Sequence, residues 1–109
     1  MARDLFPGAL EIMVLQALRR EPLHGYALAQ LIRRTSGDLL QIEEGSLYPA
    51  LQRMLKAKWV TAARGVSATN RRVRIYKITA AGRKQLEHEV ASFERMIEGI
   101  GRVLRPSQS

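Results

Sequence analysis

Helical periods in the hydrophobic pattern divide the first half of the chain into short helices. Residues 9–20 are apolar around almost the whole helical circumference, and a helix with this pattern is buried on more than one side. In a chain of this size, a partner subunit could supply the second cover. Residues 26–35 resume an amphipathic period and residues 36–38 end it. The short apolar stretch at 39–42 is consistent with a strand.

A third helix is predicted to follow, with Ser46 as its N-cap, Pro49 in its first turn and its end near Lys58. Its apolar positions recur at helical spacing and should face inward. The opposite face carries an aromatic hydroxyl, an amide and two cations but no acid, a mixture suited to phosphate oxygens and base edges. The residues of this polar face are Tyr48, Gln52, Arg53 and Lys56. For the tyrosine, a half-buried position in the core is the alternative.

Two strands are predicted at 59–64 and 71–79, because both segments are rich in β-branched and aromatic residues. A small polar hairpin tip at 65–70 separates them, which is typical of a wing. The apolar positions change parity between Ile75 and Tyr76. Either a bulge near Ile75 or a strand covered on both faces would explain this change. The pattern therefore leaves open which wing arginines face a ligand.

The last helix is predicted from Thr79, its cap, to about Leu104, with apolar residues spaced alternately by four and three. This spacing is a heptad seam. At about 1.5 Å per residue the helix is roughly 35 Å long, more than the remaining domain can cover. We therefore expect a homodimer, although the seam could instead pack back on its own domain. The expected interface residues are Leu10, Met13, Leu86, Val90, Phe93, Ile97, Ile100 and Leu104.

Together these elements predict a mainly α fold with a small β-hairpin (α+β), organised as a winged helix-turn-helix. The expected division is a DNA-binding domain at 1–79, a dimerisation helix at 80–105 and a disordered tail at 106–109. A chain of 109 residues with 46% hydrophobic content suits a single modest core. We find no signal peptide or membrane helix in the sequence, so we expect a cytoplasmic protein without a membrane partner.

Charge distribution points to a polyanionic partner. The net charge is +8, and the segment from Arg53 to Lys84 holds ten Lys and Arg residues and not one acid. A solvated surface usually mixes both signs, so this segment indicates a field directed at an anion. The basic segment alone would also serve a sequence-tolerant nucleic-acid-binding protein, either an architectural DNA binder or an RNA binder, without effector control. The same lack of acids argues against a winged helix used only for protein contacts.

Catalytic chemistry is not indicated, and no cofactor or metal is expected. The chain has no cysteine, which excludes disulfides, thiol nucleophiles and cysteine-bearing zinc sites. It also lacks a glycine-rich phosphate loop and metal-ligand spacing. We interpret His24 as a turn or cap residue, Trp59 as a core residue at the helix-to-wing junction, and the Glu43–Glu44 pair as partners of a helix dipole.

Three segments resemble the PadR-like family of transcription regulators. Residues 45–51 (GSLYPAL) resemble the family signature, 23–26 (LHGY) a second family segment, and 74–83 (RIYKITAAGR) the return strand and the helix after it. The resemblance spans about residues 10–104. The family usually has an acid where Leu55 stands and a glycine where Lys58 stands, so the turn into the wing departs from its pattern.

The resemblance implies a homodimer that represses promoters, with the third helix in the major groove of double-stranded DNA and the wing beside it. It also implies a small-molecule effector at the dimer interface. The sequence does not identify this effector, and nothing marks Trp59 as a sensor of it. The implied DNA contacts are Tyr26, Ser46, Tyr48, Pro49, Gln52, Arg53, Lys56, Arg71, Arg72 and Arg74.

Overall fold

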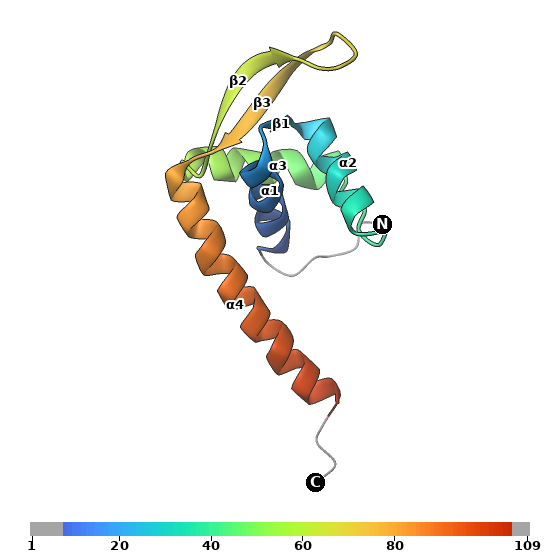
Figure 1. The fold of residues 1–109 in the computed structure, drawn as a ribbon, viewed down its shortest axis with the longest axis vertical. Helices are drawn as coiled ribbons and strands as arrows, with labels where there is room; N and C mark the ends of the chain where they lie inside the picture. Colours follow the sequence, from blue (N-terminus) through green and yellow to red (C-terminus); the bar gives the residue numbers. More distant parts are fainter. Residues whose placement is uncertain (1–7, 106–109) are drawn as a thin grey trace.

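The computed structural model describes residues 8–105, and it shows a winged helix-turn-helix of four helices and three strands over that range (Figure 1). The predicted tail at 106–109 and the first seven residues lie outside the described part of the chain. The predicted fold class is confirmed. In chain order the elements are α1 (Ala9–Arg20), β1 (Leu23–His24), α2 (Gly25–Thr35), α3 (Glu44–Lys56), β2 (Val60–Val66), β3 (Arg72–Ile78) and α4 (Ala80–Leu104).

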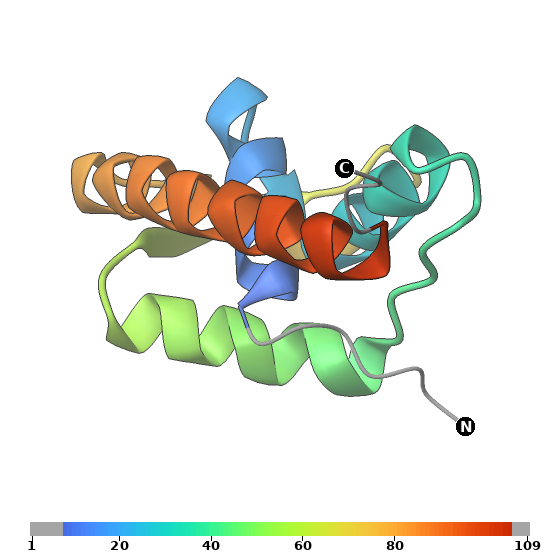
Figure 2. The ribbon, with the colours of Figure 1, turned by 90° about the horizontal axis from the view of Figure 1, so that it is seen from below.

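Helix α1 lies at the centre of the core. Its Val14 and Leu15 are completely buried, and the helix contacts α2, α3, α4 and β3. Figure 2 shows α4 crossing α1. Helix α4 of the same chain therefore supplies a second cover for the apolar circumference of α1, and an additional cover by a partner subunit stays a prediction.

The sheet is antiparallel, with β3 between β1 and β2. Strand β1 pairs with β3 through Leu23 opposite Tyr76 and His24 opposite Ile75. The sequence pattern did not predict β1, because two residues are too few to show an alternation. The β2–β3 register runs without interruption from Val60↔Ile78 to Val66↔Arg72, so of the two explanations left open for the change of parity, a bulge near Ile75 is excluded.

The change of parity in β3 has another cause. Tyr76 is buried on the core face, while Ile75 is half-buried on the outer face. Gly65 on β2 has no side chain, and a β-carbon there would lie 2.5 Å from Cγ1 of Ile75. Ile75 thus fills the space above the glycine, and this point of the strand is covered on both faces.

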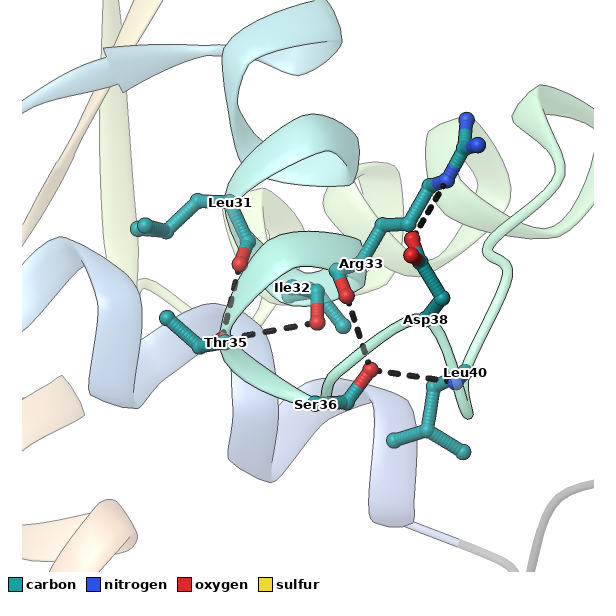
Figure 3. Close-up of polar contacts among 7 residues, drawn as sticks. All are labelled: Leu31, Ile32, Arg33, Thr35, Ser36, Asp38 and Leu40. Carbon is teal, nitrogen blue, oxygen red and sulfur yellow. Dashed lines mark hydrogen bonds and ion pairs between the residues drawn. The ribbon is translucent and has the colours of Figure 1, made fainter.

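The end of α2 is closed by local hydrogen bonds (Figure 3). The Ser36 hydroxyl donates to the Arg33 carbonyl oxygen at 3.0 Å and accepts from the Leu40 amide at 3.0 Å. Nε of Arg33 donates to the Asp38 carboxylate at 3.1 Å. These bonds confirm the predicted end of the helix at 36–38 and turn the chain toward α3.

The segment at 39–42 is not a strand. Its Leu40 and Ile42 are partly buried and pack against the core, whereas Leu39 is 87% exposed. The apolar residues of this segment therefore reflect contact with the core rather than pairing in the sheet.

Helix α3 begins earlier than predicted. Its N-cap is Glu43, not Ser46, and Pro49 lies inside the helix rather than in its first turn. A proline there leaves the carbonyl of Gly45 without its helical donor. Gly45 is exposed, so water can satisfy that carbonyl. Glu44, in the first turn, is favoured by the helix dipole.

The predicted end of α3 near Lys58 is two residues too late, since the helix ends at Lys56. Lys58 follows with φ of +66°, in the left-handed region. Its amide donates to the Leu55 carbonyl at 3.0 Å, and the Trp59 amide donates to the Met54 carbonyl at 3.0 Å. This pair of bonds is a Schellman motif, in which the left-handed position is usually glycine.

Helix α4 begins as predicted, with Thr79 as its cap. The Thr79 hydroxyl accepts from the Gly82 amide at 3.0 Å and donates to the Lys58 carbonyl at 2.7 Å, and its amide donates to the Trp59 carbonyl at 3.0 Å. A β-carbon on Gly82 would collide with the Trp59 carbonyl oxygen. The start of α4 is thereby fixed to the turn between α3 and β2. Within 8–105, no helix is both long and apolar enough to cross a membrane.

Candidate nucleic-acid interface

A groove with a volume of 930 Å³ lies between the wing, formed by β2 and β3, and the helix pair α2–α3. Residues of α2, α3, β3 and the hairpin tip line it, and arginines dominate its charged lining. Positive charge beside amide and hydroxyl groups is what a nucleic-acid surface requires. Its polar lining residues are Glu21, His24, Tyr26, Gln30, Arg34, Glu44, Tyr48, Gln52, Ser67, Thr69, Arg71, Arg72, Arg74 and Tyr76.

The strand register decides which wing arginines face this groove. Alternate residues of a strand share a face, so Arg72 and Arg74 lie on the same face as the buried Tyr76. The guanidinium of Arg74 is 5.9 Å from the centroid of the Tyr76 ring, within the range of a cation–π contact. Arg71 joins them from the hairpin tip, whereas Lys77 lies on the opposite face. Arg71, Arg72 and Arg74 therefore face the groove, and their contact with a ligand stays a prediction.

Tyr48, in the family-like segment at 45–51, contacts the family-like segment at 23–26. Its ring packs against Gly25, where a β-carbon would lie 2.8 Å from the Tyr48 hydroxyl oxygen. The residue is nevertheless exposed, at 41%, rather than half-buried in the core. Burial raises the pKa of Tyr48, and the nearby Glu44 and Tyr76 raise that pKa further. A tyrosine hydroxyl is protonated at neutral pH even without this shift, and it can donate to a phosphate oxygen.

The start of α2 also faces the groove. Nδ1 of His24 accepts from the Ala27 amide at 3.3 Å, which confirms the predicted cap. Tyr26, in the first turn of α2, is 60% exposed and lines the groove. The positive end of the helix dipole at this position favours an anion.

Arg53 lies on another side of α3. Its Nη2 and Nε are 2.8 Å and 3.2 Å from one carboxylate oxygen of Glu11 on α1. The Glu11 side chain is only 20% exposed, while that of Arg53 is 61% exposed. Arg53 is thus oriented toward α1 and does not line the groove.

The expected contact residues therefore fall into two groups. The groove brings together Tyr26, Tyr48, Gln52, Arg71, Arg72 and Arg74. The remaining four are exposed on the adjoining outer surface of α3: Ser46, Pro49, Arg53 and Lys56. Both groups include residues of α3, so the two surfaces adjoin along this helix.

Sequence reasoning missed several lining residues. Gln30 and Arg34 follow Tyr26 at intervals of four along α2, so all three share one helical face. That spacing was a usable signal. Ser67 and Thr69 at the wing tip gave no signal, because their approach to the groove depends on how the hairpin bends. Glu44 was interpreted only as a dipole partner.

The seam on α4 is buried near its start and exposed near its end. Leu86 is 2% exposed, Ile97 is 44% exposed and Leu104 is 69% exposed. Leu10 is also buried in the core of the chain, so it and Leu86 offer little surface to a partner. The end of α4 projects beyond the other helices (Figure 1). Met13, Val90, Phe93 and Ile100 are half-buried, and their place in a dimer interface stays a prediction.

The fold and the groove define a winged helix-turn-helix protein with an arginine-rich groove between the wing and the helix pair α2–α3. A model of the PadR-like family of transcriptional regulators matches residues 14–88. That match covers more than half of the chain, so the chain belongs to the PadR-like family. The family consists of transcriptional regulators rather than enzymes, and the resemblance drawn from the sequence motifs is confirmed.

Solved structures agree with this assignment. The chain is similar to a transcriptional regulator from Clostridium thermocellum, with 25% identity and a TM-score of 0.81 over 94% of this chain and 96% of that chain. It is also similar to a PadR-like transcriptional regulator from Bacillus cereus, with 28% identity and a TM-score of 0.76 over 93% and 96% of the two chains.

A third structure is that of Bacillus subtilis PadR in complex with operator DNA, with 21% identity and a TM-score of 0.66. The similarity covers 75% of this chain but only 46% of that chain. At this identity the likeness shows the shared fold alone.

Proposed function

We propose that this chain is a transcription repressor that binds a pseudo-palindromic promoter site as a homodimer. The observation that carries the proposal is the groove that joins Tyr48 and Gln52 of α3 to the arginines of the wing. The same proposal places the protein in the cytoplasm, together with the promoter DNA.

In this proposal α3 enters the major groove. Gln52 is exposed in the middle of the helix, and a glutamine amide can bind the adenine edge through two hydrogen bonds. Lys56 and Pro49 lie on the adjoining exposed stripe, where a cation would meet the flanking phosphates. Tyr48 and Tyr26 donate to phosphate oxygens from the two sides of the helix pair.

The wing supplies contacts that do not depend on sequence. Arg71, Arg72 and Arg74 place their charges on the groove side of the hairpin, and each phosphate that they neutralise releases counterions. Affinity should therefore fall steeply with salt concentration. These contacts orient the protein on the duplex while α3 reads the bases.

The exposed end of the α4 seam supports the dimer. Ile97 and Leu104 continue an apolar stripe beyond the part that the domain covers. A second copy on a two-fold axis would bury this stripe. The two copies of α3 would then meet half-sites about 34 Å apart, which is one turn of DNA.

Release by a small-molecule effector at the dimer interface is part of the proposal. The start of α4 is bonded through Thr79 to the carbonyls of Lys58 and Trp59, at the base of the wing. A change in the packing of two α4 helices would therefore move the wings and recognition helices with them. A ligand bound at the interface would thereby change the distance between the two recognition helices.

Competition binding tests the proposal. Labelled duplex from the promoter region beside the gene is mixed with the protein and challenged with unlabelled promoter duplex, random duplex or single-stranded RNA. We expect the promoter duplex to compete at far lower concentration than the other two. Equal competition by random duplex would instead establish a sequence-tolerant binder, and better competition by RNA would establish an RNA-binding protein.

A further inference from the structure

Glu44 is an acid on the recognition helix, in a groove rich in arginine. It is the first residue of α3, it is exposed, and it lines the groove. Among the described residues it takes part in no ion pair, although four arginines line the same groove. A carboxylate so placed is available to a ligand.

The position of Glu44 along α3 matches that of the other groove residues on this helix. Glu44, Tyr48 and Gln52 are spaced by four, so they form one helical stripe, and all three line the groove. The charge of Glu44 also contributes, after burial, to the raised pKa of Tyr48. Glu44 and Tyr48 are neighbours one helical turn apart, and Glu44 lies at the N-terminal end of α3, the end whose residues contact base edges in a recognition helix.

The chemistry of a carboxylate limits what it can meet on DNA. It only accepts hydrogen bonds, and phosphate oxygens repel it. The N4 amino group of cytosine is the major-groove donor that aspartate and glutamate accept from. A carboxylate on this stripe therefore weakens binding wherever it faces phosphate and strengthens binding wherever it faces a cytosine.

We propose that Glu44 is a specificity-determining residue that accepts a hydrogen bond from a cytosine N4 amino group in each half-site and repels phosphates in non-specific complexes. This inference rests on the proposed function of α3 as the recognition helix. It assigns one base to one side chain, which the resemblance to the family does not.

The chain contains a matched control. Glu43 is the exposed N-cap of the same helix, its side chain makes no capping hydrogen bond, and it does not line the groove. Both acids meet the same helix dipole. If Glu44 acts only on the dipole, then Glu44→Ala and Glu43→Ala will behave alike in DNA binding.

The experiment is selection of binding sites from a random-sequence duplex pool with the wild type, Glu44→Ala and Glu43→Ala. Affinities are then measured on the enriched duplex and on random duplex, and folding is checked by thermal unfolding. We expect the wild type and Glu43→Ala to enrich a cytosine at one position of each half-site. Glu44→Ala should lose this preference, and its ratio of specific to non-specific affinity should fall roughly 5- to 150-fold.

The outcomes separate the inference from the function on which it rests. If Glu44→Ala enriches the same cytosine as the wild type, or loses affinity equally on enriched and random duplex, the inference is wrong and the proposed function stands. If the wild type enriches no sequence at all, the proposed function itself is overturned.

Discussion

Replacing Lys58 with glycine should stabilise the fold. Lys58 has φ of +66° at the end of α3, where its amide and that of Trp59 bond to carbonyls of the last helical turn. A side chain in the left-handed region places Cβ too close to the following carbonyl oxygen, at a cost of roughly 1–2 kcal/mol. Glycine adopts the same backbone conformation without that cost.

The net gain is smaller than the strain that is removed. Glycine also makes the unfolded chain more flexible, which opposes folding by about 0.4–1 kcal/mol. The middle values of the two ranges leave a stabilisation of about 0.8 kcal/mol for Lys58→Gly. In a domain of this size such a change raises Tm by roughly 3–6 °C.

The assay is urea unfolding followed by the fluorescence of Trp59, the one tryptophan in the chain. Lys58→Ala is the matched control, because it removes the charge of Lys58 but keeps a β-carbon at the strained position. Ala57→Gly serves as the second control, since Ala57 has φ of −77° and gains nothing from glycine. We expect Lys58→Gly to unfold at higher urea concentration than both controls and the wild type. Equal midpoints for Lys58→Gly and Lys58→Ala would refute the strain at this turn.

Three further predictions concern α4 and the wing. Gly82→Ala should destabilise the fold by more than about 2 kcal/mol, because the new carbon meets a backbone carbonyl. Gly99→Ala is the control at an open helical position and should stabilise the fold by about 0.5–1 kcal/mol. Thermal unfolding of the two variants and the wild type measures both effects. Ile97→Asp should give monomers in sedimentation, and a variant that stays dimeric would disprove the proposed seam. Arg72→Ala should lower the slope of log K for DNA binding against log salt concentration by about one unit. Lys77→Ala, on the opposite face of β3, should leave this slope unchanged. Equal slopes for the two variants would show that Arg72 does not contact DNA.

Local signals in the sequence were enough to place most helix ends. His24 and Thr79 were predicted as a turn or cap residue and as a helix cap, and both accept from an amide three residues later. Such caps depend only on neighbouring residues, so no tertiary information is needed to find them. The predicted start of α3 was wrong because serine is a favoured N-cap residue and Ser46 was therefore chosen as the cap. The helix instead begins at Glu44, and no side chain caps it.

Long-range contacts could not be predicted in the same way. The Arg53–Glu11 ion pair joins residues 42 positions apart, and nothing near either residue indicates the other. The cover of α1 by α4 was missed for a similar reason, because an apolar helix surface does not show which element buries it. The change of parity in β3 likewise reflects a contact between strands, because Ile75 packs above Gly65 of β2.

Much of the groove was nevertheless predictable from residue types. The family-like motifs supplied Tyr26 and Tyr48, and the acid-free segment supplied the wing arginines. The sequence did not show which of these residues line the groove and which lie outside it. The structure places six of the ten expected contacts in the groove and four on the outer surface of α3.

The central claim is that two copies of this chain hold their recognition helices on one face of duplex DNA. Hydroxyl-radical footprinting on the promoter region beside the gene tests it most directly. Two protected patches, centred about 34 Å apart and related by symmetry, are the predicted result. A single patch, or continuous protection that does not repeat with the helical turn, would contradict the account.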